Sequence, residues 1–337
     1  MILKPLQFIY EFGSDFKNKL YDRNFIKKIK LNVPVVSIGN LSVGGTGKTP
    51  CVFLLAQEFI KLSQYKKIVI VSRSYKASLK FPQKVDLSNK SAVLTFGDEP
   101  CLLQSLLPQC SVWSGPVKYL TAQAAEIAEK PDLILIDDGF SHRKLIRNFD
   151  IVLIDATAPM NYFQSLPVGR LRESLDQLSR ADAILITRAN LVDINKVEKI
   201  KQLILKNNSK LKELIFESSS VTVLPDSVNK QDQLFVFCGL GHPKSFKSSL
   251  EALNYELLVF KEFQDHYMYK KSDLDQIFED FKTLKSTHLN LKLVTTEKDL
   301  IKIKNHPILD FIHTAKNLIE INDNKKDVLI EKICQHL

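Results

Sequence analysis

The sequence predicts an α/β protein in which a parallel-sheet domain is followed by a second, smaller α/β domain. Short β-branched runs alternate with helical patterns along most of the chain, which favours a parallel sheet covered by helices on both faces. The chain has 337 residues, too many for one ordinary core but sufficient for two domains. A polar stretch after residue 224 separates an early series of β-branched runs from a late one.

The expected strands fall into two series. The first series comprises Val33–Gly39, Lys67–Ser72, Ala92–Phe96, Leu133–Asp137, Ile151–Asp155 and Ala183–Thr187, and the second comprises Leu234–Cys238, Glu256–Phe260 and Lys292–Thr296. Ile215–Leu224, between the two series, is a possible extended hinge. We therefore expect an N-terminal segment of residues 1–32, a first domain of residues 33–225 and a smaller domain of residues 226–337.

The composition is typical of a folded cytoplasmic protein. Hydrophobic residues make up 45% and charged residues 25%, the balance of a globular chain. The formal net charge of +9 indicates an anionic partner but does not separate nucleotide, nucleic acid and acidic membrane. The five cysteines form no C-x-x-C pair, so we expect reduced, mostly structural thiols. No apolar run reaches the ~18 residues of a spanning helix, and polar residues interrupt the apolar N-terminus, so no signal peptide is expected.

A glycine-rich loop follows the first expected strand. Residues 42–49 read Ser-Val-Gly-Gly-Thr-Gly-Lys-Thr, and the helical pattern Val52–Leu62 comes next. This is the strand–loop–helix context of a Walker A loop, and it predicts a P-loop NTPase-like domain. Backbone N–H groups of such a loop turn toward phosphate oxygens, the lysine neutralises phosphate charge, and the final hydroxyl binds Mg²⁺. The residues expected to bind nucleotide are Gly44, Gly45, Thr46, Gly47, Lys48 and Thr49, and Thr49 is also expected to bind the metal.

The loop departs from the strict G-x-x-x-x-G-K-[ST] pattern, because Ser42 stands where the first glycine is required. One alternative is a glycine-rich turn that contains Lys-Thr by chance. Partition-type regulatory ATPases have a similar loop with an extra signature lysine just before the first glycine, where this chain has Val43. Val43 therefore favours a kinase over a regulatory ATPase.

Two carboxylates end another expected strand. Leu133–Asp137 leads directly into Asp138 and Gly139, which is a Walker B arrangement. Oxygen ligands suit Mg²⁺, and a doubly wound sheet gathers its ligands at the carboxyl ends of its strands. We expect Asp137 and Asp138 to hold the metal or its water shell. The alternative interpretation is a turn after a buried strand.

Taken together, these segments resemble the lipid A 4'-kinases, also called tetraacyldisaccharide 4'-kinases. The long signature is Val33-Pro-Val-Val-Ser-Ile-Gly-Asn-Leu-Ser-Val-Gly-Gly-Thr-Gly-Lys-Thr-Pro50. Further similar segments follow in order at residues 72–75, 97–100, 137–143, 166–173, 239–243, 263–266 and 296–299. The departures are Ser74, Ser141 and Tyr267, where the family usually has glycine, glutamine and often a second histidine.

The resemblance implies a membrane-associated kinase of lipid A biosynthesis, a transferase of lipid metabolism. This enzyme would use ATP and Mg²⁺ to phosphorylate the 4'-hydroxyl of a tetraacyldisaccharide 1-phosphate. The resemblance further implies that Asp98 and His266 form the base pair that activates the hydroxyl, and that Lys48 is catalytic. Residues implied to lie near phosphates, nucleotide or acceptor are Arg172, Glu173, His142, Arg73 and Tyr75.

Structural interpretations stay open for several of these residues. Arg172 and Glu173 equally suit a surface ion pair, and His142 equally suits a satisfied loop histidine. Asp98 also suits the N-cap of a helix Glu99–Leu107.

The N-terminal segment has an apolar face flanked by positive charge. Ile2, Leu6, Ile9, Phe12, Phe16 and Leu20 recur at spacings of three and four, and residues 17–30 carry six basic residues and one aspartate. The pattern suits a helix lying on an anionic leaflet, and the alternative is an amphipathic helix packed on the domain core. Because the implied substrate is a lipid, we expect a peripheral, monotopic enzyme at the cytoplasmic face of the inner membrane.

We expect no obligate protein partner and no nucleic-acid partner, because net charge alone supports nucleic-acid binding. The rival function is a P-loop regulatory ATPase that acts through protein partners. Such a switch would hydrolyse ATP without an acceptor, whereas a kinase should require its lipid.

Overall fold

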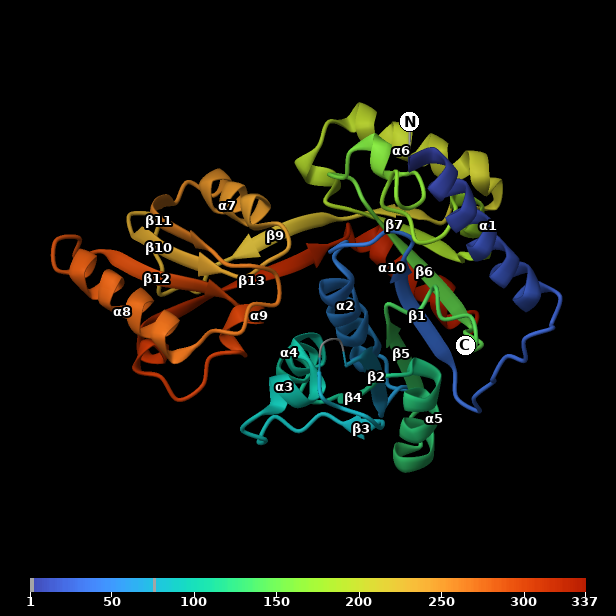
Figure 1. Cartoon of the computed structure of the whole chain (residues 1–337), viewed down its shortest axis with the longest axis horizontal. Helices are drawn as coiled ribbons and strands as arrows, with labels where there is room; N and C mark the ends of the chain where they lie inside the picture. The colour runs from blue at the N-terminus through green and yellow to red at the C-terminus, as the bar shows by residue number, and fades with distance from the viewer. Residues whose placement is uncertain (1–2, 75–76) are drawn as a thin grey trace. The chain divides into compact units, whose positions relative to one another are not determined.

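The chain forms two compact units. In the computed structural model residues 3–74 and 77–337 are described, so Ile2 and Tyr75, both named above, lie outside the described part. The first unit comprises residues 1–220 together with residues 319–337, and the second comprises residues 221–318 (Figure 1).

An eight-stranded sheet forms the centre of the first unit, with strand order β3-β4-β2-β5-β1-β6-β7-β8 (Figure 1). Its strands pair in parallel, apart from the antiparallel pair of β3 and β4. The strands are β1 (Val35–Asn40), β2 (Ile68–Arg73), β3 (Gln83–Lys84), β4 (Ser111–Gly115), β5 (Leu133–Asp137), β6 (Phe149–Asp155), β7 (Ala183–Thr187) and β8 (Ile215–Glu217). The predicted parallel-sheet domain is confirmed.

Helices cover both faces of this sheet. Every residue of β1, β5 and β7 is buried, which is the pattern of parallel strands packed on two sides. Ala122 and Ala125 of α5 (Lys118–Glu129) pack on side chains of β1, β2 and β5, whereas α6 (Ile194–Asn207) packs on β6 and β7. The other α-helices of this unit are α1 (Leu3–Asp22), α2 (Lys48–Lys61), α3 (Ala92–Phe96), α4 (Asp98–Leu106) and α10 (Asp323–Cys334).

One expected strand is wrong, because Ala92–Phe96 is the short helix α3. Ala92 and Phe96, four residues apart, are both buried, while Leu94 between them is 56% exposed. This spacing is helical, and a five-residue apolar run does not by itself distinguish a strand from a helix. The sheet position beside β2 is held instead by β4, which the sequence did not predict.

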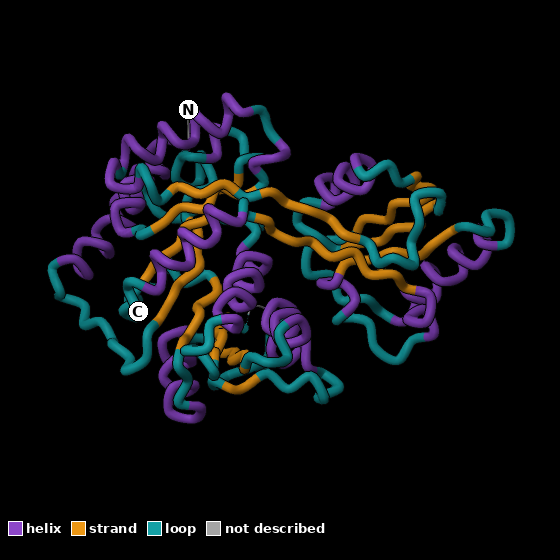
Figure 2. The backbone as a smooth tube through the Cα atoms, turned by 180° about the vertical axis from the view of Figure 1, so that it is seen from behind, coloured by secondary structure: helices purple, strands orange, loops and turns teal. Residues whose placement is uncertain are grey.

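The second unit is built on a five-stranded sheet with strand order β11-β10-β12-β13-β9. Figure 2 draws its strands in orange. The strands are β9 (Ser219–Val223), β10 (Gln233–Cys238), β11 (Glu256–Glu262), β12 (Leu291–Thr296) and β13 (Ile312–Glu320). Its helices are α7 (Pro243–Ala252), α8 (Lys271–Lys285) and the short α9 (Glu297–Leu300). Phe235 and Phe237 of β10 pack against α8 in the core. This unit is the smaller α/β domain that the sequence predicts.

The limits of the units differ from the expected division in two places. The segment expected as a hinge, Ile215–Leu224, forms β8 in the first sheet and β9 in the second. The chain end, expected in the smaller domain, belongs to the first unit. There Lys326 Nζ of α10 lies 3.6 Å from Glu58 Oε1 of α2, and the His336 ring packs against Phe149.

Helix α1 packs on the first unit through its polar face. Its buried residues are Asn18 and Tyr21, whereas the apolar side chains of the other face are exposed, apart from the half-buried Leu20. These side chains are Leu6, Ile9, Phe12 and Phe16, with exposed fractions of 51%, 65%, 66% and 57%. The alternative in which the apolar face packs on the core therefore does not hold. No helix in the described part of the chain is long and apolar enough to cross a membrane.

Candidate active site

The phosphate loop connects β1 to α2, as predicted. Gly44 and Gly47 have φ angles of 111° and 88°, in the left-handed region that glycine enters without steric cost. Gly47 is also the N-cap of α2 and offers no side chain to the first-turn N–H groups. An anion at this end of the helix would meet open N–H donors and the positive end of the helix dipole.

Side chains at the ends of β1 and β7, two strands on either side of β6, hold the loop in shape. Asn40, the last residue of β1, donates through Nδ2 to Thr46 Oγ1 at 2.9 Å. Thr187, the last residue of β7, donates to the Thr46 carbonyl at 2.9 Å, and Arg188 donates to the Gly45 carbonyl at 3.1 Å. These supports were not predicted from the sequence. The only sequence feature that marks Asn40, Thr187 and Arg188 is that each ends, or directly follows, a strand.

The acid pair follows the neighbouring strand. Asp137 ends β5 and is 2% exposed, and its Oδ2 accepts from Ser72 Oγ at 2.9 Å. Among the described residues none donates to Asp137 Oδ1, although this atom is buried. Asp138 follows with a φ of 51°, a left-handed backbone that Asp tolerates better than most residues.

These residues fit a magnesium ion. The described residues contain no group of three or more His, Cys, Asp or Glu side chains that could hold a metal. Magnesium, however, is usually held by one or two carboxylates together with waters and substrate phosphates rather than by an all-protein cage. The unpartnered Oδ1 of Asp137 is an oxygen of the required kind. A Mg²⁺ ion held through Asp137, Asp138 and Thr49 would neutralise phosphate charge.

Three cations surround the Asp138 carboxylate. Lys48 Nζ lies 3.8 Å from Oδ1, and Lys118 Nζ lies 3.6 Å from Oδ2. Arg172 donates Nη2 to Oδ1 at 2.8 Å and Nη1 to Oδ2 at 3.2 Å. Burial alone would raise the pKa of Asp138, but these charges outweigh burial and hold the pKa below its ordinary value. Asp138 is therefore ionised, with a compact positive cluster around it.

Lys118 lies at the acid pair and was not predicted from the sequence. It opens α5 and is 2% exposed, and its Nζ donates to the Asp138 carbonyl at 2.5 Å. Burial lowers the pKa of Lys118, while Asp138 and Asp137 oppose this shift. The only signal in the sequence is a lysine at the start of a helix that follows a strand, which is too common a pattern to single out one lysine.

Arg172 and His142 both lie beside the acid pair. Arg172 also donates to Asn40 Oδ1 at 2.5 Å. Its ion-pair partner is therefore Asp138, not Glu173 as the surface-pair alternative supposed. Burial, with a smaller contribution from Lys118, lowers the pKa of His142 to about 3. His142 is therefore neutral at physiological pH.

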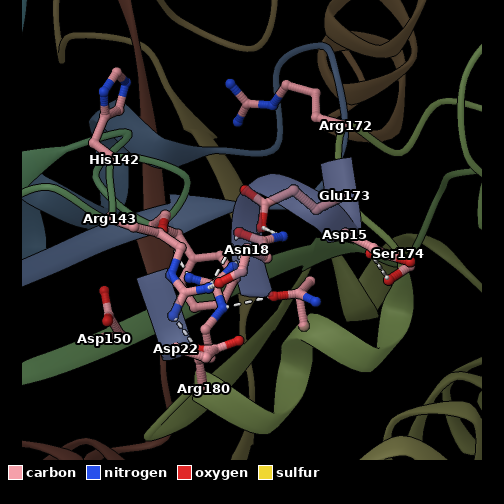
Figure 3. A network of polar contacts seen from close by, with 12 residues as sticks. Asp15, Asn18, Asp22, His142, Arg143, Asp150, Arg172, Glu173, Ser174 and Arg180 are labelled. Atoms are coloured by element: carbon pink, nitrogen blue, oxygen red, sulfur yellow. Dashed lines mark hydrogen bonds and ion pairs between the residues drawn. The ribbon is translucent and has the colours of Figure 1, made fainter. Parts of the chain in front are cut away.

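Glu173 points away from Arg172 into a buried network under α1. Its Oε2 accepts from Arg180 and, at 3.3 Å, from Asn18 Nδ2 (Figure 3). Glu173 is 7% exposed. These contacts give it protein partners of its own, so its expected role in substrate binding stays a prediction.

Asp98 lies in the first turn of α4 and is 6% exposed. The N-cap of this helix is Gly97, so the interpretation of Asp98 as the cap is wrong by one position. Asp98 Oδ1 accepts from the backbone N–H of Glu99 at 3.0 Å. His266 belongs to the second unit, so the expected Asp98–His266 pair stays a prediction.

Three C-terminal motifs meet around Asp299 within the second unit. The buried Asp299 carboxylate accepts from Gly239 N at 3.0 Å, from Thr296 Oγ1 at 2.7 Å and from Lys302 Nζ at 3.0 Å. A Cβ at Gly239 would lie 3.1 Å from Asp299 Oδ1 and 3.1 Å from the carbonyl oxygen of residue 264. A side chain at residue 239 would therefore require Asp299 or the loop that leads to His266 to shift by a few tenths of an ångström. His266 itself has a left-handed φ of 62°.

A parallel sheet that presents such a loop, with an acid pair on the adjacent strand and cations converging on it, binds the phosphates of a nucleotide and activates the terminal one. Fold and site thus define a P-loop phosphotransferase. Comparison with known proteins identifies the kind. The family described as tetraacyldisaccharide-1-P 4'-kinase, LpxK, matches residues 1–335, and the chain belongs to this family.

Individual relatives agree with the family match. The tetraacyldisaccharide 4'-kinase of Bdellovibrio bacteriovorus is 36% identical over 311 residues, covering 90% of this chain and 89% of the relative. The enzyme of Aquifex aeolicus is 35% identical over 308 residues, covering 90% of each. A crystal structure of LpxK from Aquifex aeolicus, described as an "apo" form in complex with ATP, has a TM-score of 0.76 and 30% identity over 98% of this chain and 97% of that one. The predicted family, fold class and kinase activity are confirmed.

Proposed function

We propose that this chain transfers the γ-phosphoryl group of ATP to the 4'-hydroxyl of a tetraacyldisaccharide 1-phosphate at the cytoplasmic surface of the inner membrane. The family match supports the reaction. The observation that carries the proposed site is the convergence of Lys48 and Arg172 on Asp138 beside the phosphate loop.

The loop residues bind the nucleotide in this proposal. Backbone N–H groups of residues 44–47 hold phosphate oxygens, and Lys48 stabilises the charge that spreads over the γ-phosphoryl oxygens in the transition state. Thr49, Asp137 and Asp138 would hold Mg²⁺, and the ion would supply positive charge next to the phosphates. The buried, unpartnered Oδ1 of Asp137 supports the metal site.

Asp98 and His266 act on the acceptor. The 4'-oxygen forms a bond to the γ-phosphorus, the bond from that phosphorus to the β–γ bridging oxygen breaks, and the hydroxyl proton passes to the Asp98 carboxylate. His266 orients Asp98 or carries the proton onward. The motif resemblance supports this pair, and so does the burial of Asp98. The second unit, residues 221–318, would complete the active site through His266.

Arg172 and His142 contact phosphates or acceptor. The two Arg172 hydrogen bonds to Asp138 hold a positive charge at the acid pair, where phosphate would replace part of that contact. A neutral His142 accepts or donates a hydrogen bond without adding charge. For Glu173, only the resemblance to the family supports a contact with phosphate or acceptor.

Helix α1 supports the membrane part of the proposal. Its outward side chains are large and apolar, and exposed patches of this kind mark interaction surfaces. Basic residues follow the helix, which suits attraction to an anionic leaflet. A peripheral position gives the enzyme access to a sugar headgroup whose acyl chains are rooted in the bilayer.

The proposed reaction is tested by incubating purified protein with labelled ATP and a detergent-dispersed tetraacyldisaccharide 1-phosphate, followed by thin-layer separation of the lipid. We expect a labelled lipid to form with the parent protein and not with Lys48→Ala, whose fold should remain intact by circular dichroism. Robust ATP hydrolysis without lipid, and no labelled lipid, would instead support the regulatory ATPase. Near-normal transfer by Lys48→Ala would remove Lys48 from the mechanism.

A further inference from the structure

We propose that the inward polar face of α1, made of Tyr10, Asp15 and Asn18, positions the active-site arginine Arg172. The proposal rests on the role proposed above for Arg172 at the acid pair. In this view α1 has two separate tasks on two faces. Its outward apolar face meets the membrane, and its inward polar face holds the loop that carries a phosphate-binding cation.

The contacts of α1 fall on three consecutive residues of that loop. Tyr10 donates its hydroxyl to the Arg172 carbonyl at 2.9 Å. Asn18 Nδ2 donates to Glu173 Oε2 at 3.3 Å, and Ser174 Oγ donates to Asp15 Oδ1 at 3.3 Å (Figure 3). These partners are 155 to 162 positions apart in the chain. One helix face therefore holds the whole run 172–174.

The same face also reaches the loop that follows the acid pair. Arg143, five positions after Asp138, donates Nη1 to the Asn18 carbonyl at 2.9 Å and to Asn18 Oδ1 at 3.2 Å. Arg143 also pairs with Asp22 at the end of α1. Figure 3 shows Asn18 among Arg143, Glu173 and Arg180. Helix α1 therefore contacts two loops, the one that follows Asp138 and the one that carries Arg172.

Asn18 suits this position for a chemical reason. Its amide donates to a carboxylate, Glu173, and accepts from a guanidinium, Arg143, and only a side chain with both a donor and an acceptor can do this. Asn18, Glu173 and Arg143 are 4%, 7% and 7% exposed. Buried charges of this kind are costly to leave unpaired, so residues 172–174 cannot easily shift away from the helix.

The catalytic consequence follows from where the Arg172 side chain ends. Its guanidinium binds both oxygens of Asp138 and also Asn40, which holds the phosphate loop through Thr46. A displacement of about 1 Å at a reacting centre is enough to cost a large factor in rate. We therefore expect a loss of the α1 contacts to lower turnover rather than ATP affinity.

The test uses the full-length protein and a detergent-dispersed tetraacyldisaccharide 1-phosphate, so that membrane binding does not limit the reaction. For Asn18→Ala we expect kcat to fall roughly 10-fold to 100-fold, with the KM for ATP changed less than about twofold and flotation on anionic vesicles unchanged. Tyr10→Phe, which removes one exposed hydroxyl, should lower kcat severalfold without changing the melting temperature. The matched control is Gln7→Ala, whose side chain bonds within the helix to Glu11, and it should behave as the parent.

A double variant separates positioning from general damage. If α1 acts through Arg172, then Asn18→Ala combined with Arg172→Ala should be hardly slower than Arg172→Ala alone. If the rate loss of the double variant were the product of the two single losses, the positioning role would be wrong. It would also be wrong if both Asn18→Ala and Tyr10→Phe, measured below their melting temperatures, had the kcat of the parent. If Asn18→Ala does not fold, Tyr10→Phe with its own Arg172→Ala double variant decides the question. A fully active Arg172→Ala is a different result, because it removes the proposed function of Arg172 itself.

Discussion

Arg172 and Asp138 form a two-fold hydrogen-bonded ion pair, with Nη2–Oδ1 and Nη1–Oδ2 distances of 2.8 and 3.2 Å. Paired contacts of arginine with a carboxylate are stronger and more directional than single ones. The two residues are 34 positions apart and come from loops after different strands. The pair sets the charge balance of the site, since Lys48 and Lys118 approach the same carboxylate.

Replacement of the buried cation Lys118 should destabilise the protein in a magnesium-dependent way. Lys118→Met leaves the carboxylates of Asp137 and Asp138 with less compensating charge, and breaking a buried ion pair typically costs about 3–5 kcal/mol. Since Asp138 is 28% exposed at its side chain, we expect a loss near or below the lower end of that range. Magnesium should restore part of it by binding the folded state.

The measurement is the melting temperature with and without MgCl₂, against NaCl of equal ionic strength. Lys61→Met, at a lysine whose side chain is 64% exposed, is the control and should melt like the parent. Equal responses to magnesium in Lys118→Met and the parent would argue against Lys118 as a charge partner of the metal site.

Asp98 and His266 should behave as one catalytic unit. Loss of a general base typically slows turnover 10²–10⁴-fold, so Asp98→Ala and His266→Ala should each fall in this range while ATP binding is largely retained. The double variant should be hardly slower than the worse single variant, because residues that act together give non-additive losses.

The measurement is kcat for both single variants and the double variant, with thermal melting of each as the control for folding. If the loss in kcat of the double variant were the product of the two single losses, Asp98 and His266 would act independently. A melting defect in Asp98→Ala without a kinetic defect would leave Asp98 with a structural role at the start of α4.

The outward face of α1 should bind anionic vesicles. Phe12 and Phe16 are stacked with ring centroids 6.4 Å apart and are both more than half exposed. Replacing both by Ser removes apolar area whose full burial is worth about 1.5–3 kcal/mol per side chain, so we expect vesicle affinity to fall at least roughly tenfold. Raising the salt concentration should weaken binding of the parent, because the attraction of basic residues to the surface is screened.

Vesicle flotation at low and high salt provides the measurement. Phe81→Ser is the matched control, because Phe81 is 72% exposed but lies outside α1, and its binding should equal that of the parent. Unchanged vesicle binding by the double variant Phe12→Ser and Phe16→Ser, or no vesicle binding by the parent, would mean that α1 does not mediate membrane binding.

The buried His142 should make folding stability depend on pH. The pKa of His142 is lowered to about 3 in the folded protein, against about 6.5 for an unfolded histidine. Between these values the unfolded state binds more protons than the folded one. His142 therefore destabilises the fold increasingly as the pH falls from about 6.5 toward 3, with a slope of at most about 1.4 kcal/mol per pH unit. Above about pH 7.5, where the unfolded histidine is also neutral, the effect is absent.

His142→Asn should flatten this part of the profile. The measurement is the free energy of unfolding between pH 4.5 and pH 8 for parent and variant, in the absence of nucleotide. The difference between the two proteins should change between pH 4.5 and about 7.5 and be constant above about pH 7.5. A constant difference over the whole range would mean that His142 titrates normally in the folded protein.

Local patterns in the sequence predicted most elements of the fold. The limits of β5 and β7 are those expected, and the phosphate loop lies between a strand and a helix as predicted. The failures include short segments, and the nine-residue strand β13 was not predicted either. Ala92–Phe96 is a helix, and β4 was not predicted, because Ser111, Ser114 and Gly115 interrupt its apolar pattern and neighbouring strands decide its place in the sheet.

By itself the sequence predicted which residues would bind phosphate and metal, because the glycine loop and the acid pair are runs of neighbouring residues. It also determined that α1 is amphipathic. Only the tertiary structure decided that Lys118 is buried against Asp138, that Arg172 pairs with Asp138 rather than Glu173, and that α1 packs through Asn18 with its apolar face outward. These relations join segments 20 to 155 positions apart, and they depend on which charges are buried together, a property of packing that no local pattern contains.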